Sequence, residues 1–148
     1  MTSDPTRQAA HQRRFPDNSY PDQSLTRNII ACSFTVFREF GYGFLESVYR
    51  HALAVELGYR GIAVREEVPF ELFHRGVSVG LYRADLVAEA RVIVETKTSL
   101  VLDPVARPQL LNCLCAARLP VGLILHFGPG GVQAKRVIMS NRSRLPNT

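Results

Sequence analysis

Three residues in the middle of the chain have the types and spacing of a divalent-metal site: Asp85, Glu95 and Lys97. The surrounding sequence predicts a β-hairpin with its turn at residues 89–91. Alternate side chains of a strand share one face, so Glu95 and Lys97 point to the same side and Thr96 points to the other. A carboxylate on the neighbouring strand, Asp85, would then lie beside them.

Two carboxylates on adjacent strand ends are the oxygen ligands that Mg²⁺ or Mn²⁺ prefers. A lysine beside such an ion can orient or deprotonate water and offset charge that develops on phosphorus. The alternative is a Glu95–Lys97 surface ion pair with Asp85 closing a turn, and spacing alone fits both. Sixteen of the eighteen basic residues are arginine, so a lysine at position 97 departs from the background usage.

The apolar pattern predicts an α/β fold of one mixed sheet with the element order α-α-β-β-β-α-β-β. The expected elements are helices over 25–40 and 44–57, strands over 62–73, 77–87 and 92–98, a helix that ends near 117, and strands over 121–127 and 132–139. Ser24 suits the start of the first helix. The third helix begins either after the cap Asp103 or only at Pro108, because proline disfavours a continuous helix.

Glu46 lies in the first turn of the second helix, where the helix dipole favours a negative charge. Its ordinary interpretation is a surface glutamate paired with Arg50, four residues later. Composition alone favours that pairing over a role in a site.

Length and charge set the domain organisation. The chain has 148 residues, of which 46% are apolar, enough for one domain over 24–139 without disulfides. A polar arm over 1–23 is expected to be disordered. The net charge of +5 is concentrated in residues 129–148, which hold four basic and no acidic groups. This suits a phosphate-bearing partner, although a basic tail over 140–148 can equally be solvated.

The remaining composition predicts a cytoplasmic protein. Three cysteines without a metal-binding spacing read as reduced thiols, and a zinc site at Cys113 and Cys115 is not expected. No secretory signal is visible, and no apolar stretch reaches the length of a membrane span, so no membrane association is expected. The sequence leaves open whether the protein forms a homo-oligomer.

Five blocks of the sequence resemble those of a family of small bacterial proteins, the GxxExxY proteins. The blocks begin at Gly43, Tyr82, Val94, Gln109 and Val121, and read GFLESVY, YRADLV, VETK, QLLN and VGLILHFG. They occur in the family's order and at its spacing, over about 100 residues from Leu25 to Ile138. That family is placed in the PD-(D/E)XK nuclease-like superfamily, which implies a restriction-endonuclease-like core.

The resemblance implies a role for each matching residue. Asp85 and Glu95 look like the metal-binding carboxylates, with the Thr96 backbone carbonyl as a further ligand. Lys97 resembles the catalytic lysine. Glu46 resembles an acidic residue that binds the metal directly or through water, and Gln109 resembles a glutamine that contacts the site or the substrate. Tyr49 belongs to the signature and is expected to pack against or orient Glu46.

The sequence also departs from the family pattern. Ala106 stands where the family often has histidine, and Pro108 replaces a small helix former, which makes the position of Gln109 less certain. The implied function is a Mg²⁺- or Mn²⁺-dependent nuclease acting on DNA or RNA. The alternatives are a binding module for nucleic acid or protein that keeps the fold without turnover, and a structural subunit without a site.

Overall fold

The structure is a computed structural model that describes residues 22–139. Most of the predicted arm, residues 1–21, and the predicted basic tail over 140–148, with Arg142 and Arg144, lie outside the described residues. The described part contains three helices and five strands in the predicted order. They are α2 (Gln23–Phe40), α3 (Glu46–Tyr59), β1 (Val64–His74), β2 (Val77–Ala88), β3 (Val92–Lys97), α4 (Ala106–Ala117), β4 (Val121–Gly128) and β5 (Gly131–Ile138).

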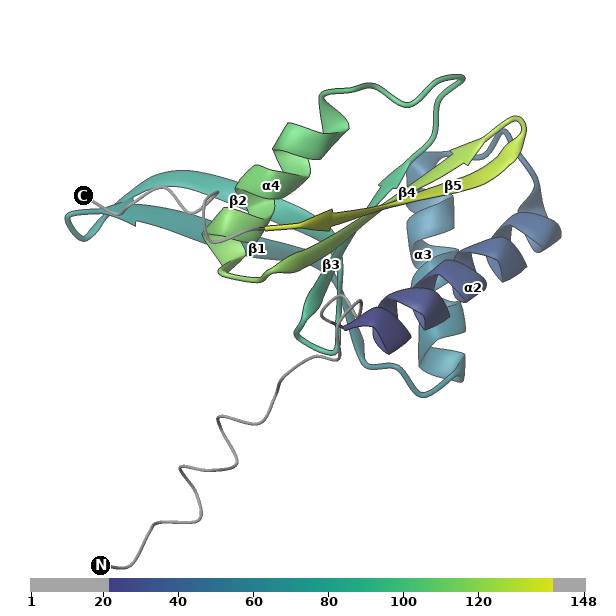
Figure 1. The fold of residues 1–148 in the computed structure, drawn as a ribbon, viewed down its shortest axis with the longest axis horizontal. Helices are drawn as coiled ribbons and strands as arrows, with labels where there is room; N and C mark the ends of the chain where they lie inside the picture. Colours follow the sequence, from purple (N-terminus) through teal and green to yellow (C-terminus); the bar gives the residue numbers. More distant parts are fainter. Residues whose placement is uncertain (1–21, 140–148) are drawn as a thin grey trace, which may run out of the picture.

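The strands form one mixed sheet in the order β1-β2-β3-β4-β5, which confirms the predicted fold class. Three neighbouring pairs are antiparallel, and the β3–β4 pair is parallel. The connection between the two parallel strands runs through α4, because parallel neighbours need a long crossover. This crossover places α4 on one face of the sheet (Figure 1).

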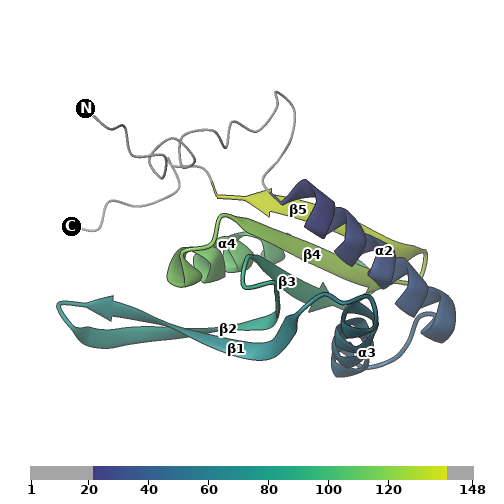
Figure 2. The same cartoon turned by 90° about the horizontal axis from the view of Figure 1, so that it is seen from below.

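Two cores lie on opposite faces of the sheet. Helices α2 and α3 cover one face, where Val92 and Val94 are fully buried with Leu53 of α3. Helix α4 covers the other face, where Ile93 is fully buried with Leu114. Figure 2 shows the sheet between these two helical layers. The alternation along β3 therefore directs Glu95 and Lys97 toward the α4 side, as the two-residue period predicts.

The outer part of the β1–β2 hairpin extends beyond the rest of the sheet (Figure 2). Strand β2 pairs with β1 over most of its length, but with β3 only from Leu86 to Ala88. β1 is an edge strand, where Pro69 is tolerated, and its pairing with β2 has a register shift between Leu72 and Phe73. The separation of β2 from β3 before Leu86 opens space on the α4 side of the sheet.

The start of α2 differs from the sequence expectation, and the start of α4 decides between the two alternatives left open for it. Helix α2 begins at Gln23 after Asp22, not after Ser24, because the Asp22 carbonyl already accepts the Thr26 N–H at 2.9 Å. Helix α4 begins at Ala106, so Pro108 lies in its first turn. A proline costs little there, because the first N–H groups of a helix have no partner within it.

The Asp103 carboxylate caps the turn before α4 by accepting the Val105 N–H at 2.9 Å. The Asp103 carbonyl also accepts the Ala106 N–H at 3.0 Å.

Among α2, α3 and α4, none is long and apolar enough to cross a membrane.

Candidate active site

Asp85 lies where β2 separates from β3. The β2–β3 ladder ends at the pair Leu86–Val94, so the next residues of the two strands are not paired. Asp85 Oδ2 instead accepts hydrogen bonds from the Thr96 N–H at 2.8 Å and from Thr96 Oγ1 at 3.1 Å. Because the N–H and C=O of one strand residue point to the same side, the Thr96 carbonyl faces the same gap as the carboxylate.

Glu95 lies against Asp85. The two carboxyl groups are near enough for the Asp85 charge to act on Glu95. Burial raises the pKa of Glu95 to about 8, and the negative charge of Asp85 acts in the same direction, whereas the Lys97 ammonium opposes it. The two carboxyl groups therefore share one partly enclosed site in which two negative charges are unfavourable without a nearby cation.

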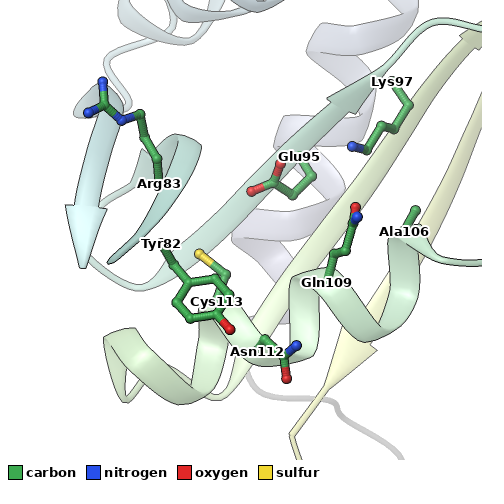
Figure 3. A pocket seen from close by; sticks show the side chains of 8 residues that line it. All are labelled: Tyr82, Arg83, Glu95, Lys97, Ala106, Gln109, Asn112 and Cys113. Carbon is green, nitrogen blue, oxygen red and sulfur yellow. The ribbon is translucent and has the colours of Figure 1, made fainter. Parts of the chain in front are cut away.

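Lys97 and Gln109 line the same cavity as Glu95. The cavity has a volume of about 270 Å³ and lies between β2, β3 and α4. The Lys97 ammonium and the Gln109 amide both point toward the space beside Glu95 (Figure 3). Gln109 keeps this position despite Pro108, because Gln109 N–H bonds to the Val105 carbonyl at 3.1 Å and the first turn of α4 is regular there.

The surface ion pair considered for Glu95 and Lys97 is not found. Both residues are only partly exposed. No salt bridge joins them in the part of the chain that the structure describes. Their side chains line a cavity instead of an open sheet face.

Glu46 is the first residue of α3 and is partly buried. Burial raises its pKa, and the charge of Asp85 raises it further. Lys97, the Thr98 backbone N–H and Arg50 act in the opposite direction. The helix start therefore brings a third carboxyl group within electrostatic range of Asp85.

The predicted Glu46–Arg50 pair is wrong. Within residues 22–139, the ion pairs of Arg50 are with Glu66 and Glu67 of β1, each at 3.7 Å. Arg50 follows Glu46 by one helical turn but turns its guanidinium toward the edge strand. Glu46 is thus left available to the site.

Tyr49 holds the loop that precedes Glu46. Its side chain is fully buried and stacks on Phe127 of β4, with ring centroids 4.5 Å apart. Its hydroxyl donates to the Gly41 carbonyl and accepts the Phe44 N–H at 3.3 Å. Tyr49 therefore fixes the loop between α2 and α3 that leads to Glu46, and its role in packing against or orienting Glu46 stays a prediction.

The cavity contains side chains that were not predicted as site residues: Tyr82, Arg83, Asn112 and Cys113. Asn112 follows Gln109 by three residues of a helix, so the shared face was visible in the sequence. Burial raises the pKa of the Cys113 thiol to about 12, with Glu95 and Asp85 adding to the effect. Cys113 is therefore a neutral thiol beside the carboxylates, whereas Cys115 is exposed on the other side of α4.

His126 fastens the loop that follows β3. In the parallel register His126 lies beside Lys97, and its Nε2 is 2.9 Å from the Ser99 carbonyl oxygen and 3.0 Å from Ser99 Oγ. The Ser99 hydroxyl donates to the Val101 carbonyl at 2.7 Å. His126 Nε2 is thus the donor to Ser99. Sequence reasoning missed this contact, because only the β3–β4 register reveals it.

No group of three or more His, Cys, Asp or Glu side chains in residues 22–139 is arranged to hold a metal ion. Glu46 is therefore near Asp85 and Glu95 without forming one compact cluster with them. The close pair, Asp85 and Glu95, with the Thr96 carbonyl facing the same gap, is a donor set of hard oxygen atoms. Such a set fits a cation that keeps several water molecules, as Mg²⁺ does.

Comparison with known proteins places the chain in a family. The crystal structure of SSO0001 has a similar fold, with a TM-score of 0.53 and 16% sequence identity over 82% of this chain. The matched region is 62% of the length of SSO0001. A comparison with curated proteins gives no match. The family model described as the PD-(D/E)XK nuclease superfamily matches residues 23–137, which include the whole candidate site, and the chain therefore belongs to that superfamily.

Proposed function

We propose that the protein is a divalent-metal-dependent nuclease that hydrolyses phosphodiester bonds of DNA or RNA. One observation carries the proposal: Glu95 lies within electrostatic range of both Asp85 and Lys97 where β2 leaves β3, and it lines one cavity with Lys97 and Gln109. The hydrogen bonds to Thr96 explain Asp85 alone, whereas the burial of Glu95 beside a second carboxylate is unfavourable unless a cation offsets the repulsion.

The donor set fits Mg²⁺ or Mn²⁺. Asp85 Oδ2 is occupied by Thr96, which leaves Oδ1 to act as a ligand together with the Glu95 carboxylate and the Thr96 carbonyl. Glu46 would act through water, since it is not part of one compact cluster with the other two acids. When bound, the ion would supply Lewis-acid activation of the phosphodiester.

The protein's own side chains supply the other requirements of hydrolysis. The Lys97 ammonium, directed into the cavity beside Glu95, can orient the attacking water and offset charge on the phosphoryl oxygens. The Gln109 amide points to the same space and can hold either the water or a substrate oxygen. His126 fixes the loop that follows Lys97, and Tyr49 fixes the loop that precedes Glu46.

The decisive experiment is a cleavage assay on single- and double-stranded DNA and RNA, with Mg²⁺, with Mn²⁺ and with EDTA. Asp85→Asn and Lys97→Met are each expected to lower the rate by roughly 10²-fold or more, in line with the loss of a positioned catalytic group. Glu39→Gln is the matched control, because Glu39 is exposed on α2 on the opposite face of the sheet.

Equal metal-dependent rates for wild type and both site variants would overturn the proposal. Retained nucleic-acid binding without cleavage in any metal would favour the other candidate function, a binding module that keeps the fold.

A further inference from the structure

The cavity beside Glu95 does not end at Lys97. A second hollow of about 300 Å³ shares Lys97, Ala106 and Gln109 with it and lies against the loop before α4. A third hollow of about 260 Å³ shares Ala106 with both, and Leu102 and Asp103 with the second. The three hollows therefore follow one another around the first turn of α4, which we call the α4 track.

Cationic side chains lie along the α4 track. Lys97 lines the first and second hollows, and Arg107 and Lys135 line the third. Arg107 and Lys135 are exposed, and neither makes a salt bridge within the described residues. Their charge is thus available to an anionic partner, unlike that of Arg50, Arg60 and Arg91, which pair with acids.

The direction of Lys135 follows from strand alternation. Lys135 pairs with Ile124 of β4, which is buried in the core under α4. The next residue, Arg136, points to the other face and donates to Thr26 Oγ1 of α2 at 2.9 Å. Arg136 therefore contacts α2, whereas Lys135, on the opposite face of β5, extends the α4 track beyond the candidate site.

We propose that the α4 track binds the sugar-phosphate backbone of the substrate strand on one side of the scissile bond. The strand passes from the cavity beside Glu95, around the first turn of α4, to the phosphate contacts of Arg107 and Lys135. This rests on the proposed function, since the same strand presents its scissile phosphate to Asp85, Glu95 and Lys97. The α4 track adds a sequence-independent, salt-sensitive contribution to affinity.

The test measures binding separately from cleavage. Fluorescence anisotropy of a labelled 20-nucleotide single strand and of its duplex, in EDTA, compares wild type with the double variant Arg107→Ala/Lys135→Ala. The matched control is Arg27→Ala/Arg38→Ala, which removes the same charge from exposed positions of α2. Thermal melts establish that both double variants are folded.

The α4 track variant is expected to bind about 20-fold or more weakly at 0.1 M salt, and its log–log salt slope should fall by about 0.7–0.9 for each cation. The control should keep the wild-type slope. With Mn²⁺, the control variant Arg27→Ala/Arg38→Ala should hydrolyse a small phosphodiester, bis(p-nitrophenyl) phosphate, at the wild-type rate, because neither residue lies in the site or in the α4 track.

Equal loss of affinity in the two double variants, or no loss in either, overturns the proposal while leaving the nuclease function intact. A track-dependent affinity without cleavage by any metal form supports the α4 track and overturns the proposed reaction. A wild-type protein that binds neither oligonucleotide but binds an acidic protein overturns the assignment to nucleic acid.

Discussion

The Asp85 carboxylate takes the place of a strand neighbour for Thr96, since its Oδ2 accepts both the N–H and the hydroxyl of that residue. Thr96 is fully buried, so these donors have little access to water. Asp85 thus completes the fold at the same position where it enters the candidate site. Stability and activity are expected to respond differently to its replacement.

Asp85→Ala is expected to lower the free energy of unfolding by about 1–3 kcal/mol, because it leaves the buried Thr96 donors unsatisfied. Asp85→Asn keeps one carbonyl acceptor and should cost less. Both variants should lose cleavage, since neither offers a carboxylate to a metal ion. Urea denaturation and cleavage rates measured on the same preparations check this, and equal stability of the two variants would contradict it.

The stability of the metal-free protein should decrease between pH 4.5 and about 8. Glu95 has a pKa of about 8 in the folded protein against 4.5 for an ordinary glutamate, so in this window the unfolded chain binds fewer protons. Glu95→Gln removes the titrating group and should stabilise the metal-free protein at pH 8, by an amount on the order of a few kcal/mol.

Urea denaturation in EDTA at pH 5 and pH 8 measures the Glu95 effect, with Glu39→Gln as the exposed control. Mg²⁺ at pH 8 should raise the melting temperature of wild type more than that of Glu95→Gln. A Glu95→Gln protein that keeps the wild-type pH dependence would show that another group causes it.

Tyr49→Phe should loosen the loop that leads to Glu46. The variant keeps the stacking on Phe127 but loses the hydroxyl bonded to Gly41 and Phe44, which is expected to cost about 1–2 kcal/mol. Hydrogen exchange of the loop amides should quicken. The control is Tyr59→Phe, because Tyr59 is 88% exposed; the same change in both variants would argue against the prediction.

Gly128→Ala should test the packing of His126. A Cβ at position 128 would lie 2.9 Å from the His126 ring, so the substitution is expected to cost about 1–3 kcal/mol. The same substitution in a His126→Ala background should cost much less, which a double-mutant cycle measures. Gly130→Ala is the control, since a Cβ there meets no atom within 4 Å. Additive effects at positions 126 and 128 would contradict the contact.

The element order and the face shared by Glu95 and Lys97 were predictable, because apolar alternation and turn residues are local signals. The turn over 89–91 and the strand that follows it lie where the sequence placed them. The Asp85–Thr96 contact was not predictable, since it depends on where the β2–β3 ladder ends. The start of α4 was not predictable from Pro108, because proline is tolerated in the first turn of a helix but not in its interior, and the sequence does not show which of the two Pro108 occupies.

Contacts across the crossover were also beyond sequence reasoning. His126 and Ser99 are 27 residues apart and meet only through the parallel register of β3 and β4. The pairing of Glu46 with Arg50 failed for a related reason: β1, a distant segment, offers Arg50 two glutamates. Helical spacing favoured Glu46 as the partner of Arg50, whereas the fold places Glu66 and Glu67 of β1 beside it.

The parallel pairing of β3 with β4 also bears on how the protein folds. The hairpin β2–β3 needs only a short turn to form, whereas β4 must be recruited through a crossover whose closure entropy opposes early pairing. The carboxylates of the hairpin can therefore meet before Lys97 acquires its neighbour His126 and before Gln109 arrives with α4. A nascent or truncated chain that ends before α4 would therefore carry Asp85, Glu95 and Lys97 without Gln109 and without the strand β4 that pairs with β3.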